Sequence, residues 1–95
     1  MIDYSYIQVF KALADETRFK ILQEIAQNEE ICVCKLIEKF EIAQSKLSYH
    51  LKLLLEAGLI NVKPRGKWNF YRIDIENFIK LTTSKIICHR RSYYH

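Results

Sequence analysis

Glycine and proline are scarce in this chain of 95 residues, which has two glycines, Gly58 and Gly66, and one proline. So few turn-forming residues are atypical of a β-sandwich or β-barrel and favour a mostly helical fold. Two isolated glycines also exclude the glycine-rich loops that bind dinucleotides or nucleoside triphosphates. A function is therefore to be sought on helices and their side chains.

The chain also lacks any apolar segment near the roughly 18 residues that a membrane-spanning helix needs. Residues 1–4 do not show the basic and then apolar layout of a signal peptide. With 49% hydrophobic and 27% charged residues, the composition is typical of one globular domain, which we expect to cover residues 1–95. We therefore predict a cytoplasmic protein with no membrane partner.

Basic residues are concentrated in the middle of the chain. Residues 44–72 hold six basic side chains and one acidic one, whereas residues 1–43 hold five basic and eight acidic ones. The whole chain carries a net charge of +4. A solvated lysine-rich face would explain such a segment, and so would a surface that contacts nucleic acid. The pattern within the segment favours nucleic acid.

Helical periodicity predicts five helices along the chain. Asp15 is placed to cap the second helix and Gly58 to end the fourth. Phe10 and Phe19 fall on the sides of the first two helices that we expect to face the core. The five helices are expected at 3–13, 16–26, about ten residues ending near Phe40, 44–57 and about 75–87.

The helix expected at 44–57 has the clearest pattern, because four leucines repeat at core-facing spacing: Leu47, Leu51, Leu54 and Leu55. Three residues separate it from the helix before it, which ends near Phe40, so the two helices form a helix-turn-helix. Two β segments, 59–63 and 67–73, follow around Pro64-Arg65-Gly66 and would form a basic hairpin, or wing. The predicted fold is mainly α, a winged helix-turn-helix of about five helices and a two-stranded hairpin.

The second helix of such a motif enters the major groove with its first turns, so base contacts are expected from Gln44, Ser45, Lys46 and Tyr49. Phosphate contacts or packing roles are expected from Ser48, His50 and Lys52. The wing tip carries three cations that suit a phosphate or the minor groove, namely Lys63, Arg65 and Lys67. Nearby, Trp68 and Tyr71 are expected to pack in the core or as a pair across the hairpin. Arg72 is expected to form an internal ion pair or to contact DNA.

Four stretches of this sequence resemble the ArsR (ArsR/SmtB) family of bacterial winged-helix repressors. They are LADETRFKIL at Leu13–Leu22, ICVCKL at Ile31–Leu36, SYHL through EAGLI at Ser48–Ile60, and GKWNFYR at Gly66–Arg72. The resemblance implies a homodimer joined through its terminal helices. It also implies that the dimer binds a two-fold double-stranded operator and releases it on metal binding.

The Cys32-Val33-Cys34 segment resembles the arsenic-sensing branch of the family. In that branch, cysteines lie at the start of the first helix of the helix-turn-helix. That branch often has a third cysteine where this chain has Ile37, and the family usually has a serine where it has Ala43. Several relatives carry a zinc site on the last helix. We do not predict that site here, because the histidines after Asp74 lack the required spacing.

Thiolates suit soft or borderline ions, here As(III) or Sb(III) first, then Cd(II), Pb(II) or Zn(II). On a regular helix, side chains two residues apart point about 200° apart, so chelation by Cys32 and Cys34 favours an unwound 31–35. Cys88 is the one further cysteine in the chain, and solvent or a small thiol is the alternative third ligand. The two cysteines could also be small buried hydrophobes. A structural disulfide is disfavoured in the cytoplasm.

The sequence thus predicts a metal-responsive repressor that requires no cofactor and is not an enzyme. No nucleophile–base pair and no pair of carboxylates has a spacing that supports catalysis. Three alternatives stay open on the same scaffold: a thiol redox or persulfide sensor, a DNA-binding protein without a ligand response, and a winged helix that contacts protein or RNA. Residues 88–95 are expected to form a flexible tail.

Overall fold

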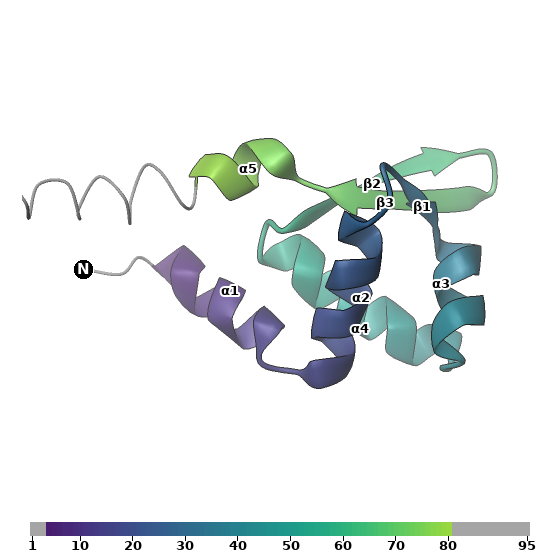
Figure 1. Ribbon diagram of the computed structural model, residues 1–95, viewed down its shortest axis with the longest axis horizontal. Coiled ribbons are helices and arrows are strands. Elements are labelled where there is room, and N and C mark those ends of the chain that lie inside the picture. The colour runs from purple at the N-terminus through teal and green to yellow at the C-terminus, as the bar shows by residue number, and fades with distance from the viewer. Residues whose placement is uncertain (1–3, 81–95) are drawn as a thin grey trace, which may run out of the picture.

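The computed structural model describes residues 4–80, and Figure 1 shows helices α1–α4 on one side of a small sheet. The predicted tail at 88–95, with Cys88, and the rest of the fifth helix lie outside the described residues. No helix within 4–80 is long and apolar enough to cross a membrane. The elements are α1 Tyr4–Leu13, α2 Glu16–Ala26, β1 Ile31–Cys32, α3 Val33–Phe40, α4 Gln44–Glu56, β2 Ile60–Arg65, β3 Trp68–Ile73 and α5 Ile75–Lys80.

Local signals fix the helix ends much as predicted. The Asp15 carboxylate accepts a hydrogen bond from the Arg18 N–H at 2.9 Å and so caps α2. Gly58 follows α4 with a φ of 75°, a left-handed conformation that glycine adopts without a steric cost. Ala43 precedes α4 in an extended conformation and makes no side-chain cap hydrogen bond.

Helices α3 and α4 are joined by Glu41–Ala43, the three-residue connection that the sequence predicts. Glu41 ends α3 in the left-handed region, with φ 50° and ψ 41°, and its N–H donates to the Ile37 carbonyl at 3.0 Å. Within 4–80 it is the one residue other than glycine with a positive φ. The turn of the helix-turn-helix therefore depends on the conformation of this single residue.

The sheet has three antiparallel strands in the order β1-β3-β2, one strand more than predicted. Ile31 pairs with Tyr71 and Cys32 with Phe70, so the segment that leads into α3 is also an edge strand of the wing. A two-residue strand has too little alternation to be recognised in a sequence. The hairpin is also longer than expected, because Arg65 still pairs with Trp68 and the turn falls at Gly66-Lys67.

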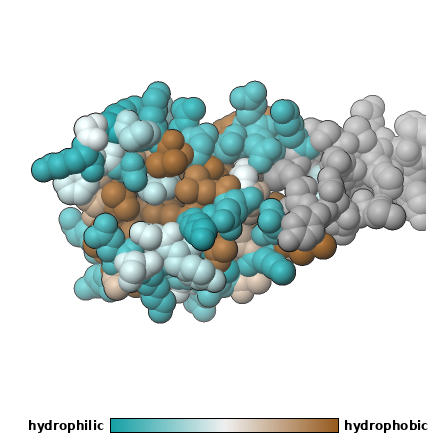
Figure 2. All heavy atoms as spheres, turned by 180° about the vertical axis from the view of Figure 1, so that it is seen from behind, coloured by the Kyte–Doolittle hydropathy of each residue, from teal (hydrophilic) through white to brown (hydrophobic). Residues whose placement is uncertain are grey.

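The core lies between the helices and the inner face of the sheet. Three of the four predicted leucines of α4 are buried, and Leu55 is partly buried at the edge. The expectation that Phe10 and Phe19 face the core is wrong, because these side chains are 54% and 44% exposed. Figure 2 shows apolar side chains gathered across the rear of the molecule among hydrophilic ones. The fully buried large residues are Ile21, Ile25, Leu36, Leu47, Leu51, Leu54 and Leu59.

Hydrogen bonds attach the start of helix α5 to the residues that follow α4. The Asp74 carboxylate accepts from the Asn77 N–H at 3.1 Å and so caps this helix. The Asn77 side chain in turn donates to the Gly58 carbonyl at 2.7 Å. The start of the last described helix is thereby fastened to the end of α4.

Candidate functional site

Helix α4 presents a polar side to solvent. Tyr49 is 57% exposed, while Leu47 and Leu51 turn inward from the same helix. The exposed residues on α4 include those expected to contact bases or phosphates: Gln44, Ser45, Lys46, Ser48, Tyr49 and Lys52. The helix therefore offers a surface that could enter a major groove.

His50 does not belong to this surface. Its side chain is only 4% exposed, and an Arg18 guanidinium nitrogen lies 3.0 Å from its Nδ1. Burial is the main cause that lowers the pKa of His50 from 6.5, and the charges of Arg18 and Lys46 lower it further, while Asp15 opposes them. Of the two roles expected for His50, its burial and its contact with Arg18 favour packing over a DNA contact.

The wing exposes Lys63, Arg65 and Lys67, but Arg65 is engaged within the protein. Its two terminal nitrogens lie 2.7 and 2.8 Å from the two carboxylate oxygens of Glu30. Its guanidinium carbon also lies 5.1 Å from the centre of the Phe70 ring. The internal ion pair expected for Arg72 is thus made by Arg65. Arg72 donates instead to the Asn61 side chain at 3.2 Å.

Glu30 has no role predicted from the sequence, and no local signal indicates one. The residue precedes β1, and its contact with Arg65 spans 35 positions of the chain. Of the two aromatic residues expected to pack, Tyr71 is buried at 7% exposure, whereas Trp68 is 46% exposed. The ammonium of Lys67 lies 5.8 Å from the centre of the Trp68 ring.

Cys32 and Cys34 lie together at the start of α3. Cys32 is the N-cap residue, with an extended conformation of φ −70° and ψ 142°, and its sulfur accepts from the Cys34 N–H at 3.3 Å. Their Cα atoms are 5.2 Å apart and the structure joins their sulfurs as a disulfide, which the sequence disfavoured. Because one cysteine is extended and the other helical, their sulfurs meet while 33–35 stay helical. The unwinding of 31–35 expected on chelation of an ion stays a prediction.

No third metal-binding side chain joins the two cysteines within residues 4–80. In that range, no three His, Cys, Asp or Glu residues are placed to hold a metal ion together. Cys88, the sulfur expected as a third ligand, lies outside this range. Both described cysteines are half-buried and border solvent. The described part of the site is therefore a pair of sulfurs open to a further ligand.

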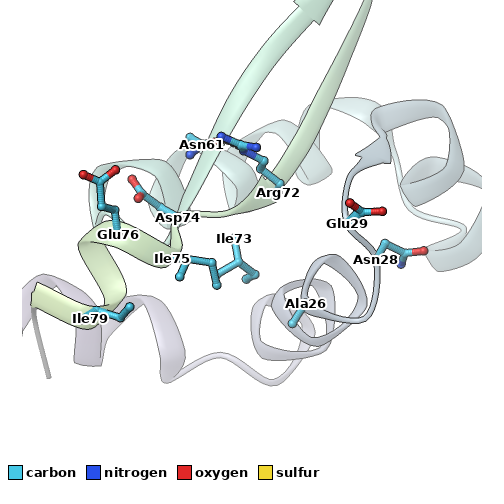
Figure 3. A pocket seen from close by; sticks show the side chains of 10 residues that line it. All are labelled: Ala26, Asn28, Glu29, Asn61, Arg72, Ile73, Asp74, Ile75, Glu76 and Ile79. Atoms are coloured by element: carbon cyan, nitrogen blue, oxygen red, sulfur yellow. Dashed lines mark hydrogen bonds between the residues drawn. The ribbon is translucent and has the colours of Figure 1, made fainter.

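Away from the cysteines, a cavity of about 630 Å³ lies between the end of α2, the base of the hairpin and α5. Figure 3 shows Asp74 and Glu76 at one end of it and Glu29 at the other. Asp74 already accepts the Asn77 N–H as the cap of α5. These carboxylates therefore do not converge on a common point.

The chain matches the model of "Bacterial regulatory protein, arsR family" over residues 15–62, which contain α2, α3 and α4. It is 47% identical over 83 residues to the arsenical resistance operon repressor of Bacillus subtilis (strain 168), covering 87% of this chain and 79% of the relative. It is 36% identical over 84 residues to a cadmium resistance transcriptional regulatory protein, a CadC homolog of Staphylococcus aureus, covering 88% and 69%.

Two solved structures share the fold and have a sequence identity of at least 25% to this chain. Reduced HlyU from Vibrio cholerae N16961 superimposes with a TM-score of 0.68 at 30% identity, covering 87% of this chain and 90% of that one. A homodimeric winged helix-turn-helix DNA-binding domain from Mycobacterium bovis gives a TM-score of 0.72 at 25% identity, covering 96% and 84%. These matches confirm the predicted winged helix-turn-helix. The chain belongs to the arsR family of bacterial regulatory proteins and is a DNA-binding transcriptional regulator, not an enzyme.

Proposed function

We propose that this regulator is a cytoplasmic homodimeric repressor that releases its operator when a soft metal or metalloid ion binds Cys32 and Cys34. As(III) or Sb(III) fits a thiolate pair best, and Cd(II), Pb(II) and Zn(II) are the other candidates. Relatives that are named arsenical and cadmium resistance regulators support this range of ions. The observation that carries the proposal is the meeting of the two sulfurs at the start of α3.

The position of Cys32 suits a thiolate. Its sulfur accepts the Cys34 N–H, and the positive end of the α3 dipole lies beside it. Reduction of the disulfide by two electrons, with uptake of two protons, gives the two thiols, and an ion then takes both sulfurs as their protons leave. Lys35, exposed in the same first turn of α3, adds positive charge nearby.

As(III) favours three sulfurs, so the proposal includes a third ligand. Cys88 from the same or the partner subunit supplies it, or else solvent or a small thiol completes the site. The Cys88→Ser variant separates these cases. An unchanged affinity for arsenite removes Cys88 from the ligand set, and a large loss assigns it there.

The route from ion to DNA is short. Cys32 and Cys34 open α3, and the other end of α3 leads through Glu41 into α4. An ion that shifts the start of α3 therefore tilts α4 in the groove. Each tenfold loss of operator affinity requires about 1.4 kcal/mol of coupling, and operator DNA must weaken ion binding by the same factor.

On the DNA side, we assign base contacts to Gln44, Ser45, Lys46 and Tyr49, all exposed in the first turns of α4. Ser48 and Lys52 lie on the same surface and would contact phosphates, with Lys63 and Lys67 of the wing. In a dimer the two copies of α4 would lie about 34 Å apart, in successive major grooves.

Operator binding measured by fluorescence anisotropy tests the proposal. The chain is kept reduced with a phosphine, because a dithiol reductant would capture arsenite. Arsenite, antimonite, Cd(II) and Zn(II) are added in turn, and at least one should weaken binding tenfold or more. Cys32→Ser and Cys34→Ser should abolish this response. If ion affinity is equal with and without operator, the switch fails even though both ligands bind.

The disulfide in the structure favours a second candidate, a thiol redox sensor. In that case hydrogen peroxide takes two electrons from the two thiols, a sulfur–sulfur bond forms, and the peroxide is reduced to water. Operator release by peroxide without any metal, lost in either serine variant, would support this function. Release by arsenite under constant phosphine would support the metal sensor instead.

A further inference from the structure

Arg65 stands one residue before the turn at the tip of the wing, yet its guanidinium points at the protein. Both of its terminal nitrogens are paired with Glu30, one to each carboxylate oxygen, at 2.7 and 2.8 Å. Two parallel bonds of this kind hold an arginine in a defined orientation and are stronger than a single contact. Glu30 is the more sheltered partner, with a side chain 22% exposed against 55% for Arg65.

The strand register explains how Arg65 reaches Glu30. Arg65 is opposite Trp68, and two residues along β3 lies Phe70, opposite Cys32 of β1. Paired residues share a face of an antiparallel sheet, as do residues two apart, so these side chains lie on one face. Arg65 therefore crosses the central strand over Phe70 and meets Glu30 just before β1.

We propose that Glu30 is a positioning residue for DNA binding, which acts by holding Arg65 on the sheet and away from the phosphate backbone. The planar fork of donors that binds the Glu30 carboxylate is the same group that binds a phosphate. The two partners compete for one guanidinium, so the wing contacts DNA with fewer cations than its sequence carries. This inference depends on DNA binding by the family and not on the metal site.

The test compares Glu30→Gln with Glu29→Gln in the full reduced chain. Both variants remove one negative charge from adjacent positions, but Glu29 is exposed and makes no ion pair within residues 4–80. The probe is a labelled duplex of roughly 30 base pairs from the region upstream of the chain's own gene, long enough for two half-sites. Affinity is measured by anisotropy over a range of salt concentrations.

Glu30→Gln should tighten binding at least about threefold beyond Glu29→Gln, because a bidentate pair is released to the DNA. It should also make the slope of log affinity against log salt concentration more negative, by about 0.9 for each wing that gains a phosphate contact. A residue that only stabilised the fold would not move this slope. In an Arg65→Gln background, Glu30→Gln should have no more effect than Glu29→Gln.

Arg65→Lys gives an independent measurement. Lysine keeps the charge but cannot form the two parallel bonds to Glu30, so this variant should bind at least as tightly as the parent chain. The proposal is overturned if Glu30→Gln and Glu29→Gln have the same affinity and salt slope. It is equally overturned if Glu30→Gln binds DNA more weakly while its thermal unfolding is unchanged, because the ion pair would then present Arg65 to DNA.

Discussion

The guanidinium of Arg18 in α2 donates to Nδ1 of His50 in α4 at 3.0 Å, inside the core. The same guanidinium donates to the carbonyls of Ala12 at 2.6 Å and Lys11 at 3.1 Å, at the end of α1. One buried side chain thus joins three helices, including α4, to which we assign the base contacts. Because Nδ1 accepts this bond, the proton of neutral His50 is on Nε2, which has no hydrogen-bond partner among residues 4–80.

Acid should destabilise the fold through His50. Burial lowers the pKa of His50 below the 6.5 of an exposed histidine, so the unfolded chain binds this proton more readily than the folded one. The contribution of neutral His50 to stability is therefore complete above about pH 6.5 and is lost as the pH falls through the folded-state pKa. Thermal unfolding between pH 5 and 8 would measure this loss.

His50→Gln is the matched variant for that measurement, because a glutamine oxygen can still accept from Arg18 but does not titrate in this range. It should lose the part of the acid sensitivity that comes from position 50. If parent and variant show parallel stability profiles across this range, the histidine is not the cause. The other two histidines, His89 and His95, are present in both chains and cancel in the comparison.

Ala43→Ser should stabilise α4. Ala43 already has the extended conformation of an N-cap, with φ −60° and ψ 144°, and lacks only a side-chain acceptor. A serine hydroxyl can accept an N–H of the first turn, which contributes about 0.5–2 kcal/mol. The free energy of unfolding from urea titrations should rise by that amount. Ala43→Val, which has no acceptor, serves as the control and should not raise it.

Gly58→Ala should destabilise the protein by more than Gly66→Ala. Both glycines have a positive φ, 75° and 63°, so each alanine costs about 1 kcal/mol in backbone strain. At Gly66 a Cβ would meet open space, whereas at Gly58 it would collide with the side-chain amide of Asn77. That amide would have to move and give up its bond to the Gly58 carbonyl. Equal unfolding free energies for the two variants would contradict this account.

Wing and helix residues should affect DNA binding in different ways. Lys67→Gln removes an exposed cation from the wing turn, so it should weaken binding to all duplexes alike and reduce the salt slope by about 0.9 per lost phosphate contact. Gln44→Ala should instead weaken binding selectively, by about 1–3 kcal/mol for the preferred sequence. Binding to a set of single-base operator variants would separate the two patterns.

Local patterns predicted most of the fold. The leucine spacing of α4, the Asp15 cap and the glycine after Leu55-Glu56-Ala57 are all determined by neighbouring residues, and all match the structure. The exposure of Phe10 and Phe19 was not predictable in this way. Which side of an amphipathic helix is buried depends on the other elements packed on it, and here Ile21 takes the buried position on α2.

The features missed at the site come from contacts between distant segments. The pairing of Cys32 with Phe70 makes β1 a strand, and the Glu30–Arg65 pair depends on that strand. His50 is similar, because only the position of Arg18 in three dimensions shows that its imidazole is turned inward. Residue types and spacing identified the two cysteines and the exposed side of α4, whereas the tertiary structure decided which cations remain available to DNA.

Glu41 gives the helix-turn-helix an energetic property of its own. A residue with a Cβ held at a φ of 50° costs about 1–2 kcal/mol relative to ordinary helical geometry. That penalty is similar in size to the free energy that changes operator affinity tenfold. The turn between α3 and α4 is therefore strained by about the free energy that the proposed switch requires, and relaxation of Glu41 would contribute to operator release in that proposal.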